Sequence, residues 1–147
     1  MPQRTVRFED LVVGDAVLSV SRVVTREDVK RYADASGDQN PLHQEEDFAR
    51  AVGFPGIIAH GMFTMGHLAT SLTDWLGNPS RLKRLTVQFR APVFMGETIV
   101  AEGRVKALDR ETRTAVLDVW VRVERDGTTE YPIRKSEAVV GFPDPQG

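Results

Sequence analysis

The sequence contains no cysteine, which excludes disulfides, thiolate metal sites and a cysteine nucleophile. It contains no apolar run close to the roughly 18 residues of a membrane span, and its first residues lack the pattern of a secretory signal. Its formal net charge of −2 lacks the basic excess typical of nucleic-acid-binding domains. A Gly-rich phosphate loop and a Gly-x-Ser-x-Gly elbow are also missing, so we expect no nucleotide cofactor. These absences predict a cytoplasmic protein that binds neither nucleic acid nor membrane.

The length of 147 residues suits one domain that buries roughly 70% of its unfolded surface. Neither an internal repeat nor a convincing linker interrupts the chain. We therefore expect a single domain over residues 1–147, with tails at about 1–7 and 143–147.

Three segments predict helices. Thr25 and Asp28 have the spacing of a capping box, with Asp in place of Glu, and this first helix should stop at Gly37. A short second helix is expected over 45–51. The segment 61–76 is apolar on nearly all sides, so we expect a helix that is buried on nearly all sides.

The pattern then changes from a period of 3.6 to a period of 2, which predicts strands. The predicted strands lie at about 16–24, 85–90, 99–106, 115–124 and 129–141. Asp126-Gly127 is a strong hairpin signal, and Pro132 indicates either an edge strand or a bulge. A curved antiparallel sheet wrapped around helix 61–76, an α+β fold, is the economical arrangement, although periodicity also permits other helix-on-sheet folds. Because such a sheet has exposed edges, we expect a dimer.

Two proton-transfer side chains, Asp38 and His43, lie five residues apart across a stiff turn. Asn40-Pro41 predicts a stiff turn after the helix, because proline fixes its own φ and keeps the residue before it out of the helical region. Each side chain alone could be structural, Asp38 in the turn and His43 as a helix cap. Together, a carboxylate and an imidazole can hold a water molecule and move protons to and from a neighbouring carbon. Asp38 and His43 are therefore the candidate catalytic pair.

The start of helix 61–76 is a second candidate feature. A helix N-terminus offers backbone N–H groups and a positive partial charge, and a glycine at that point lets a ligand approach closely. Gly61 could instead be only a tight helix start. The chemical interpretation is that the Gly61 amide stabilises an oxyanion that forms at a carbonyl.

The remaining histidines and a cluster of cations can be considered as a metal site and as a carrier-binding site, but their patterns are less specific. His60 and His67 are separated by about 10 Å along a helix, too far to share one ion, so we expect no metal site. Arg81, Lys83 and Arg84 cluster between the helix and the next strand. This cluster is interpreted either as solvated surface or as a site for the phosphates of a carrier or for an acidic carrier protein.

These motifs resemble those of the MaoC-like family of (R)-specific enoyl-CoA hydratases and 3-hydroxyacyl-thioester dehydratases. The likeness rests on Tyr32, on the block Gly37-Asp-Gln-Asn-Pro-Leu-His43, on Ala49 and on the block Ala59-His-Gly-Met62. Within the family, the segment 59–66 is most similar to the catalytic subunits of mycobacterial (3R)-hydroxyacyl-ACP dehydratases. The resemblance covers nearly the whole chain and is strongest from Thr25 to Pro92.

The resemblance implies a hot-dog fold and a role for each matched residue. It implies that Asp38 and His43 form the catalytic dyad, that the Gly61 amide binds the thioester carbonyl, and that Asn40, Tyr32 and His60 support the site. The implied reaction adds water to a trans-2-enoyl thioester of CoA or acyl-carrier protein and gives the (3R)-hydroxyacyl product, or runs in reverse without a cofactor.

One position departs from the pattern of the family. Some members place a serine on the central helix to support the aspartate, and the matching position here is Ala69. Thr64, Thr70 or Ser71 could supply that hydroxyl instead.

Two other functions remain open. A hot-dog thioesterase also needs an oxyanion site, but it directs water onto the carbonyl carbon. A subunit that requires a paralogous partner chain is the second alternative. Either a homodimer or a heterodimer with a paralogue is therefore compatible with the sequence.

Overall fold

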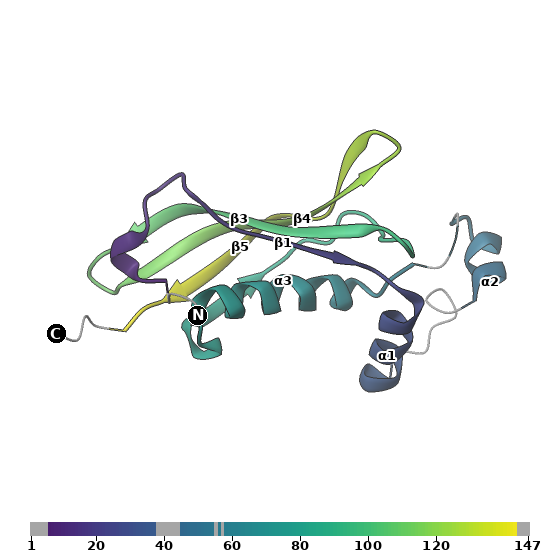
Figure 1. Ribbon diagram of the computed structural model, residues 1–147, viewed down its shortest axis with the longest axis horizontal. Helices are drawn as coiled ribbons and strands as arrows, with labels where there is room; N and C mark the ends of the chain where they lie inside the picture. The colour runs from purple at the N-terminus through teal and green to yellow at the C-terminus, as the bar shows by residue number, and fades with distance from the viewer. Residues whose placement is uncertain (1–5, 38–44, 55, 57, 144–147) are drawn as a thin grey trace, which may run out of the picture.

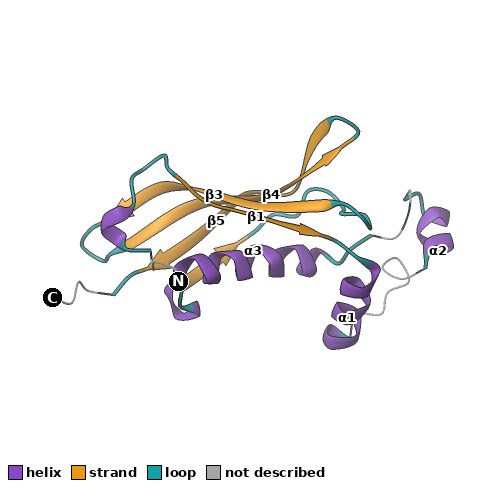
Figure 2. Cartoon of the chain, viewed as in Figure 1, coloured by secondary structure: helices purple, strands orange, loops and turns teal. Residues whose placement is uncertain are grey.

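The computed structural model describes residues 6–37, 45–54, 56 and 58–143. It shows one antiparallel sheet with a long helix along one face (Figures 1 and 2). In chain order the elements are η1 (Phe8–Asp10), β1 (Ala16–Val23), α1 (Arg26–Ser36), α2 (Glu46–Ala51), α3 (Gly61–Leu76), η3 (Pro79–Arg81), β2 (Leu82–Thr86), β3 (Thr98–Asp109), β4 (Thr114–Arg125) and β5 (Thr128–Gly141). The predicted α+β class is confirmed.

The sheet has five strands in the order β1-β3-β4-β5-β2, and every neighbouring pair is antiparallel. The hairpin predicted at Asp126-Gly127 joins β4 to β5. Both turn residues have positive φ, 52° and 77°, which matches the strand twist that a tight hairpin requires. β1 and β2 are the two outer strands, so each has one edge without a strand partner in this sheet.

The core lies between the sheet and α3, which contacts every strand. Leu68, Leu72 and Leu76 of α3 are fully buried, and they belong to the same cluster as Leu117 and Ile133 of the sheet. Replacement of fully buried leucines such as these leaves cavities that typically cost about 2–5 kcal/mol. This shared core fixes where the two ends of α3 lie.

The expectation that α3 is buried on nearly all sides is wrong for the single chain. Met62 is 54% exposed, and Gly66 and Thr70 are exposed as well. The physical reason is that the sheet is open and covers only one side of the helix. A stripe of α3 therefore faces away from the sheet.

The strand predicted around 85–90 ends earlier than its periodicity suggests. β2 stops at Thr86, and Phe89 is 49% exposed instead of buried in the core. Phe89 still lies beside β5, where it forms an isolated bridge with Ile133.

Pro132 lies on an interior strand, so the edge alternative is wrong and the bulge alternative is confirmed. Val121 pairs with Ile133 and Val123 pairs with Glu130, so two steps along β4 correspond to three along β5. The Pro132 carbonyl accepts a hydrogen bond from the Arg90 amide at 2.8 Å. The bulge thus ties the segment after β2 to β5.

The capping box predicted at the start of α1 is present. The Thr25 hydroxyl accepts from the Asp28 amide, and the Asp28 carboxylate accepts from the Thr25 amide. α1 ends at Gly37, whose φ of 80° closes the helix as a left-handed cap. α1 and α2 lie beyond the N-terminal end of α3 (Figure 1).

None of the helices in the described part of the chain is both long enough and apolar enough to span a membrane.

Candidate active site

The N-terminal end of α3 is open to an incoming group. His60 is the N-cap, and its carbonyl accepts from the amides of Phe63 and Thr64 at 3.0 and 3.3 Å. The amides of Gly61 and Met62 come before this ladder, where a helix has no backbone acceptors to offer them. The first turn carries no acidic side chain, and Gly61 is exposed. The positive end of the helix dipole is therefore available to an electron-rich oxygen.

Gly61 lies beside the ring of Phe89. A Cβ atom on this residue would lie 3.3 Å from two ring atoms of Phe89. That distance is tight for a methyl group against an aromatic ring, so Gly61 lets the ring approach the helix end. Sequence analysis missed Phe89, because its alternation with polar neighbours indicated an ordinary core position.

An aromatic cluster joins α1 to the start of α3. The rings of Tyr32 and His60 lie 4.9 Å apart, and Tyr32 meets Phe63 edge-on at 6.1 Å. His60 is only 2% exposed. The structure thus brings together Gly61 and two of the predicted supporting residues, Tyr32 and His60.

A cation that the sequence did not single out, Arg22, lies against this aromatic cluster. The Arg22 guanidinium lies 5.2 Å from the centre of the Phe63 ring and donates to Asp28 at 2.9 Å. Arg22 therefore links β1, α1 and α3. Its place near the end of an exposed strand gave no sequence signal for this role.

Asp28 is expected to contribute measurably to stability through these contacts. Burial alone raises the pKa of its carboxyl, but hydrogen bonds from Thr25 and Arg22 outweigh burial, so the net pKa lies below the ordinary 3.8. Asp28→Ala is expected to lower the free energy of unfolding at neutral pH by about 1–2 kcal/mol. Urea unfolding measures this cost, and Asp28→Asn serves as the control that keeps an oxygen acceptor.

The sign of the pH dependence follows from the lowered pKa. The stabilisation by the Asp28 charge is present above the unfolded-state pKa and is lost as the pH falls through the folded-state pKa. The difference between wild type and Asp28→Ala should therefore shrink in that acidic range. An unchanged difference down to full protonation would show that the charge of Asp28 contributes nothing.

The predicted dyad, Asp38 and His43, lies outside the described residues, as does Asn40. The described elements that flank this segment are α1, which ends at Ser36, and α2, which begins at Glu46. Because α1 packs on the start of α3 through Tyr32, the chain enters the segment from an element already beside Gly61.

The hydroxyls that could support the aspartate are distinguished by the structure. Ser71 donates to the His67 carbonyl of its own helix at 2.7 Å. Thr70 is exposed, whereas Thr64 is 3% exposed in the first turn of α3. Ala69 is half-buried and has no hydroxyl to offer. Of the three candidates, Thr64 is the one in the first turn of α3, near Gly61.

His67 has a structural contact. Its Nε2 lies 2.9 Å from the Val20 carbonyl oxygen of β1, so the ring binds α3 to an outer strand. His67 is therefore a buried histidine with a hydrogen-bond partner on the sheet.

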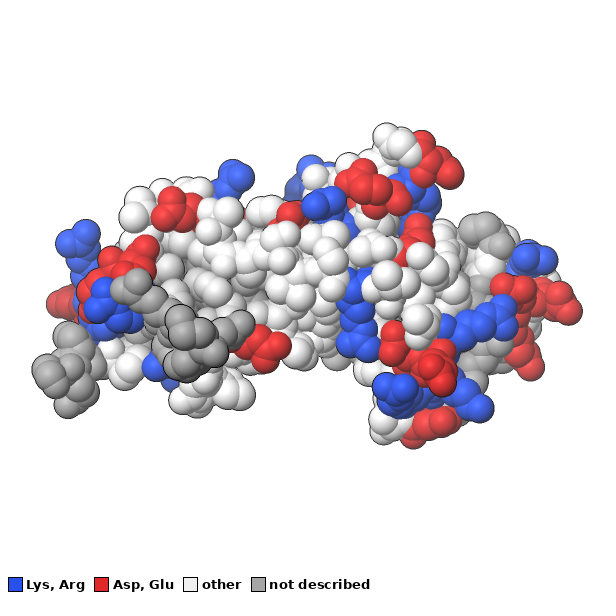
Figure 3. All heavy atoms as spheres, in the orientation of Figure 1, with Lys and Arg blue, Asp and Glu red and all other residues white. Residues whose placement is uncertain are grey.

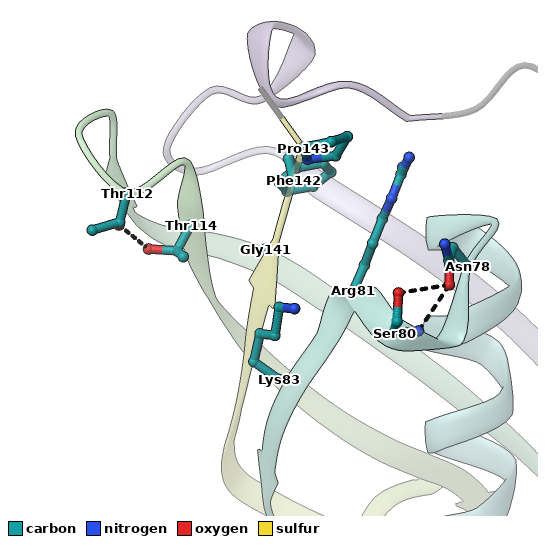
Figure 4. Close-up of a pocket in the computed structure, with 9 residues that line it drawn as sticks. All are labelled: Asn78, Ser80, Arg81, Lys83, Thr112, Thr114, Gly141, Phe142 and Pro143. Atoms are coloured by element: carbon teal, nitrogen blue, oxygen red, sulfur yellow. Dashed lines mark hydrogen bonds between the residues drawn. The ribbon is translucent and has the colours of Figure 1, made fainter. Parts of the chain in front are cut away.

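The predicted carrier cluster lies at the opposite end of α3. Arg81 and Lys83 line a pocket of about 600 Å³ (Figure 4). Arg81 also donates to the carbonyl of Leu76, the last residue of α3. Arg84 follows on β2 but is not among the residues that line this pocket. The 16 residues of α3 separate this end from Gly61 by about 24 Å. Within one chain, the structure does not bring the cluster to the open end of the helix.

A long helix packed along one face of a five-stranded antiparallel sheet is the arrangement expected of a hot-dog fold. The family described as "MaoC like domain" matches residues 5–127, and the chain belongs to this family.

Similar proteins agree on the type of chemistry. The chain is 34% identical over 139 residues to a 3-hydroxybutyryl-CoA dehydratase of Methylorubrum extorquens, which covers 91% of this chain and 88% of the relative. It is 31% identical over 134 residues to an (R)-specific enoyl-CoA hydratase of Rhodospirillum rubrum, covering 86% and 92%. Two mycobacterial 3-hydroxyacyl-thioester dehydratases, X and Y, also match over about half of the chain. The predicted likeness to hydro-lyases is confirmed.

Solved structures confirm the predicted hot-dog fold. The structure described as an (R)-hydratase from A. caviae involved in PHA biosynthesis superimposes with a TM-score of 0.81 at 28% identity. The match covers 92% of this chain and 99% of the other.

Proposed function

We propose that this protein adds water to trans-2-enoyl thioesters to give (3R)-3-hydroxyacyl thioesters, and that it also catalyses the reverse dehydration. The observation that carries the proposal is the open N-terminus of α3 at Gly61 in a chain of the MaoC-like family. The Asp38–His43 motif supplies the acid and base that this chemistry requires.

The helix end would activate the substrate. The thioester carbonyl oxygen accepts from the Gly61 amide and gains negative charge as the reaction proceeds, which the helix end stabilises. Withdrawal of electrons through the conjugated double bond makes C3 electrophilic. Because the carbonyl is fixed at one end, the substrate needs only a positioned water molecule beside C3.

The dyad would supply that water and its protons. A water molecule held by Asp38 and His43 loses one proton to the dyad as its oxygen bonds to C3. The dyad returns a proton to C2, so water adds across the double bond with no net proton change. Addition of the hydroxyl group and the proton to the same face of the double bond is the syn addition that the resemblance to the family implies.

Crotonyl-CoA hydration tests the proposal. The purified chain should lower the enoyl absorbance and form (3R)-3-hydroxybutyryl-CoA, identified by chiral analysis of the released acid. Thiol release from acyl-CoA without hydration would identify a thioesterase instead. Absence of activity together with co-purification of a paralogous chain would identify one subunit of a two-chain enzyme.

We also propose that the working form is a homodimer. The outer strand β1 exposes Val20 and Val23, and Met62 of α3 is exposed as well. On the face seen in Figure 3 the area over β1 and α3 is mostly uncharged, and charged side chains gather toward the two ends. A second copy would cover these apolar side chains and the strand edge. The cytoplasmic location expected from the sequence remains a prediction.

Thr64 is expected to be a positioning residue for the dyad aspartate. Thr64→Val, which keeps the shape but removes the hydroxyl, should lower kcat for crotonyl-CoA hydration by about tenfold with a smaller change in KM. Thr64→Ser should restore most of the activity, since it returns the hydroxyl. Equal losses in both variants would mean that packing, rather than the hydroxyl, matters at this position.

A further inference from the structure

A second group of cations lies near the candidate site and was not singled out by the sequence. It surrounds a pocket of about 330 Å³. Arg90 lines one side, and Tyr131, Arg134 and Lys135 of β5 line the other, with Glu130 as the only carboxylate among the residues that line it. Three cations against one carboxylate give the pocket an excess of positive charge.

The pocket is linked to the open end of α3 through Phe89. The Phe89 ring contacts Gly61, and its backbone pairs with Ile133. The next residue, Arg90, donates its amide to the Pro132 carbonyl at 2.8 Å. Consecutive Cα atoms are about 3.8 Å apart, so Arg90, which lines the pocket, directly follows the residue whose ring lies beside Gly61.

The backbone of β5 directs two of the cations outward. Val119 pairs with Ser136 and Val121 with Ile133, so β5 has one extra residue in this stretch. Lys135 has a φ of 53°, in the left-handed region that non-glycine residues seldom adopt. A bulge of this kind changes the direction of side chains at the edge of a ladder. Both Arg134 and Lys135 are exposed as a result.

These cations are available to an anion. Within the residues that the structure describes, Arg90, Arg134 and Lys135 form no ion pair, whereas Arg125 on β4 is held by Glu97 at 2.7 Å. The Arg90 guanidinium donates to the Gln88 side-chain oxygen, a neutral partner that leaves its charge uncompensated. The Arg134 guanidinium lies 5.0 Å from the centre of the Tyr131 ring, which orients it without neutralising it.

We propose that this pocket binds the phosphate groups of a CoA carrier while the thioester carbonyl lies at Gly61. The inference rests on the proposed function, because it assigns a binding pocket to the phosphate end of the same thioester substrate. Guanidinium groups match phosphate geometry well, and an ammonium adds a further charge. The inference replaces the Arg81–Lys83–Arg84 cluster as the carrier site within one chain.

The test compares substrates with and without phosphate. Steady-state kinetics are measured with crotonyl-CoA and with crotonyl-N-acetylcysteamine, which carries the same thioester but no phosphate. Arg134→Gln/Lys135→Gln should raise KM for crotonyl-CoA by about tenfold, with kcat little changed, and should leave the phosphate-free substrate unaffected. Lys83→Gln/Arg84→Gln removes the same charge at the far end of α3 and provides the comparison.

Direct binding separates this inference from the proposed function. Calorimetric titration with 3′-phospho-ADP should show binding to the native chain and about tenfold weaker binding to Arg134→Gln/Lys135→Gln. The single variant Arg134→Gln gives a milder test if thermal unfolding shows that the double variant is destabilised.

Three outcomes would overturn the inference. The first is a larger effect from Lys83→Gln/Arg84→Gln, and the second is an equal effect on both thioesters. The third is an effect limited to crotonyl-acyl-carrier protein, which would assign the pocket to a protein surface instead. Binding of 3′-phospho-ADP by a chain that hydrates neither thioester would retain the pocket and reject the proposed function.

Discussion

Asp38→Asn and His43→Ala are each expected to lower kcat for crotonyl-CoA hydration by at least about 10²-fold. An amide cannot accept the proton that a carboxylate accepts, and alanine removes the imidazole altogether, so each change removes one of the two proton-transfer groups. The loss should appear in kcat and kcat/KM alike, because the interactions removed operate mainly in the transition state. The measurement is the initial rate of enoyl absorbance loss at saturating substrate.

A matched control removes a carboxylate nearby. Asp47→Asn makes the same chemical change on the exposed surface of α2 and should leave turnover near the native value. Circular dichroism and thermal unfolding should show all three variants folded. Near-normal turnover in either dyad variant would falsify the assignment of that residue as catalytic.

Gly61→Ala is expected to lower kcat/KM by about 10²-fold. The added methyl group would meet Phe89 at 3.3 Å. We also expect it to hinder the approach to the amide that we propose as the carbonyl-binding donor. A displaced or covered oxyanion donor typically costs that much or more in rate. Stability should fall as well, since either the ring or the helix end must move.

The double variant Gly61→Ala/Phe89→Leu separates the two effects. Leucine is smaller than phenylalanine and relieves the crowding, so unfolding should return toward that of Phe89→Leu alone. Activity should remain low, because the methyl group still covers the amide. Recovery of full activity in the double variant would mean that Gly61 serves only to accommodate the ring.

Most of the elements could be predicted because their causes are local. The capping box of α1 needs only Thr25 and Asp28 at the right spacing, and the β4–β5 hairpin needs only Asp126 and Gly127 in the turn. α3 was predicted over the same residues, since its apolar pattern is long.

The predictions that were wrong or left open concern residues whose surroundings are set by segments distant in the sequence. Phe89 has the alternation of a core strand, yet it ends beside Gly61 and is half exposed, because β2 stops at Thr86. Pro132 fitted an edge or a bulge equally well until β2 was found on the outer side of β5. Met62 is exposed because the sheet is open and covers only one side of α3. Sequence periodicity does not predict how far a sheet wraps around a helix.

In the candidate site, too, residues in short motifs could be predicted from the sequence, whereas contacts between distant segments could not. Gly61, Tyr32 and His60 were found from their motifs, and the fold brings them together. Arg81, Lys83 and Arg84 drew attention as a cluster because they are close together in the sequence. Arg90 and Arg134 are 44 residues apart and become neighbours only when Gln88–Arg90 pairs with β5.

The amino-acid sequence by itself determined the chemistry that this protein carries, because side-chain identity and short spacing set acid–base groups, turns and helix ends. The tertiary structure alone decided which ring lies beside Gly61, which side of α3 stays exposed and which cations line the pocket between Arg90 and β5. Those contacts join segments far apart in the chain, and the free energy that selects them comes from burial and strand pairing across the whole domain.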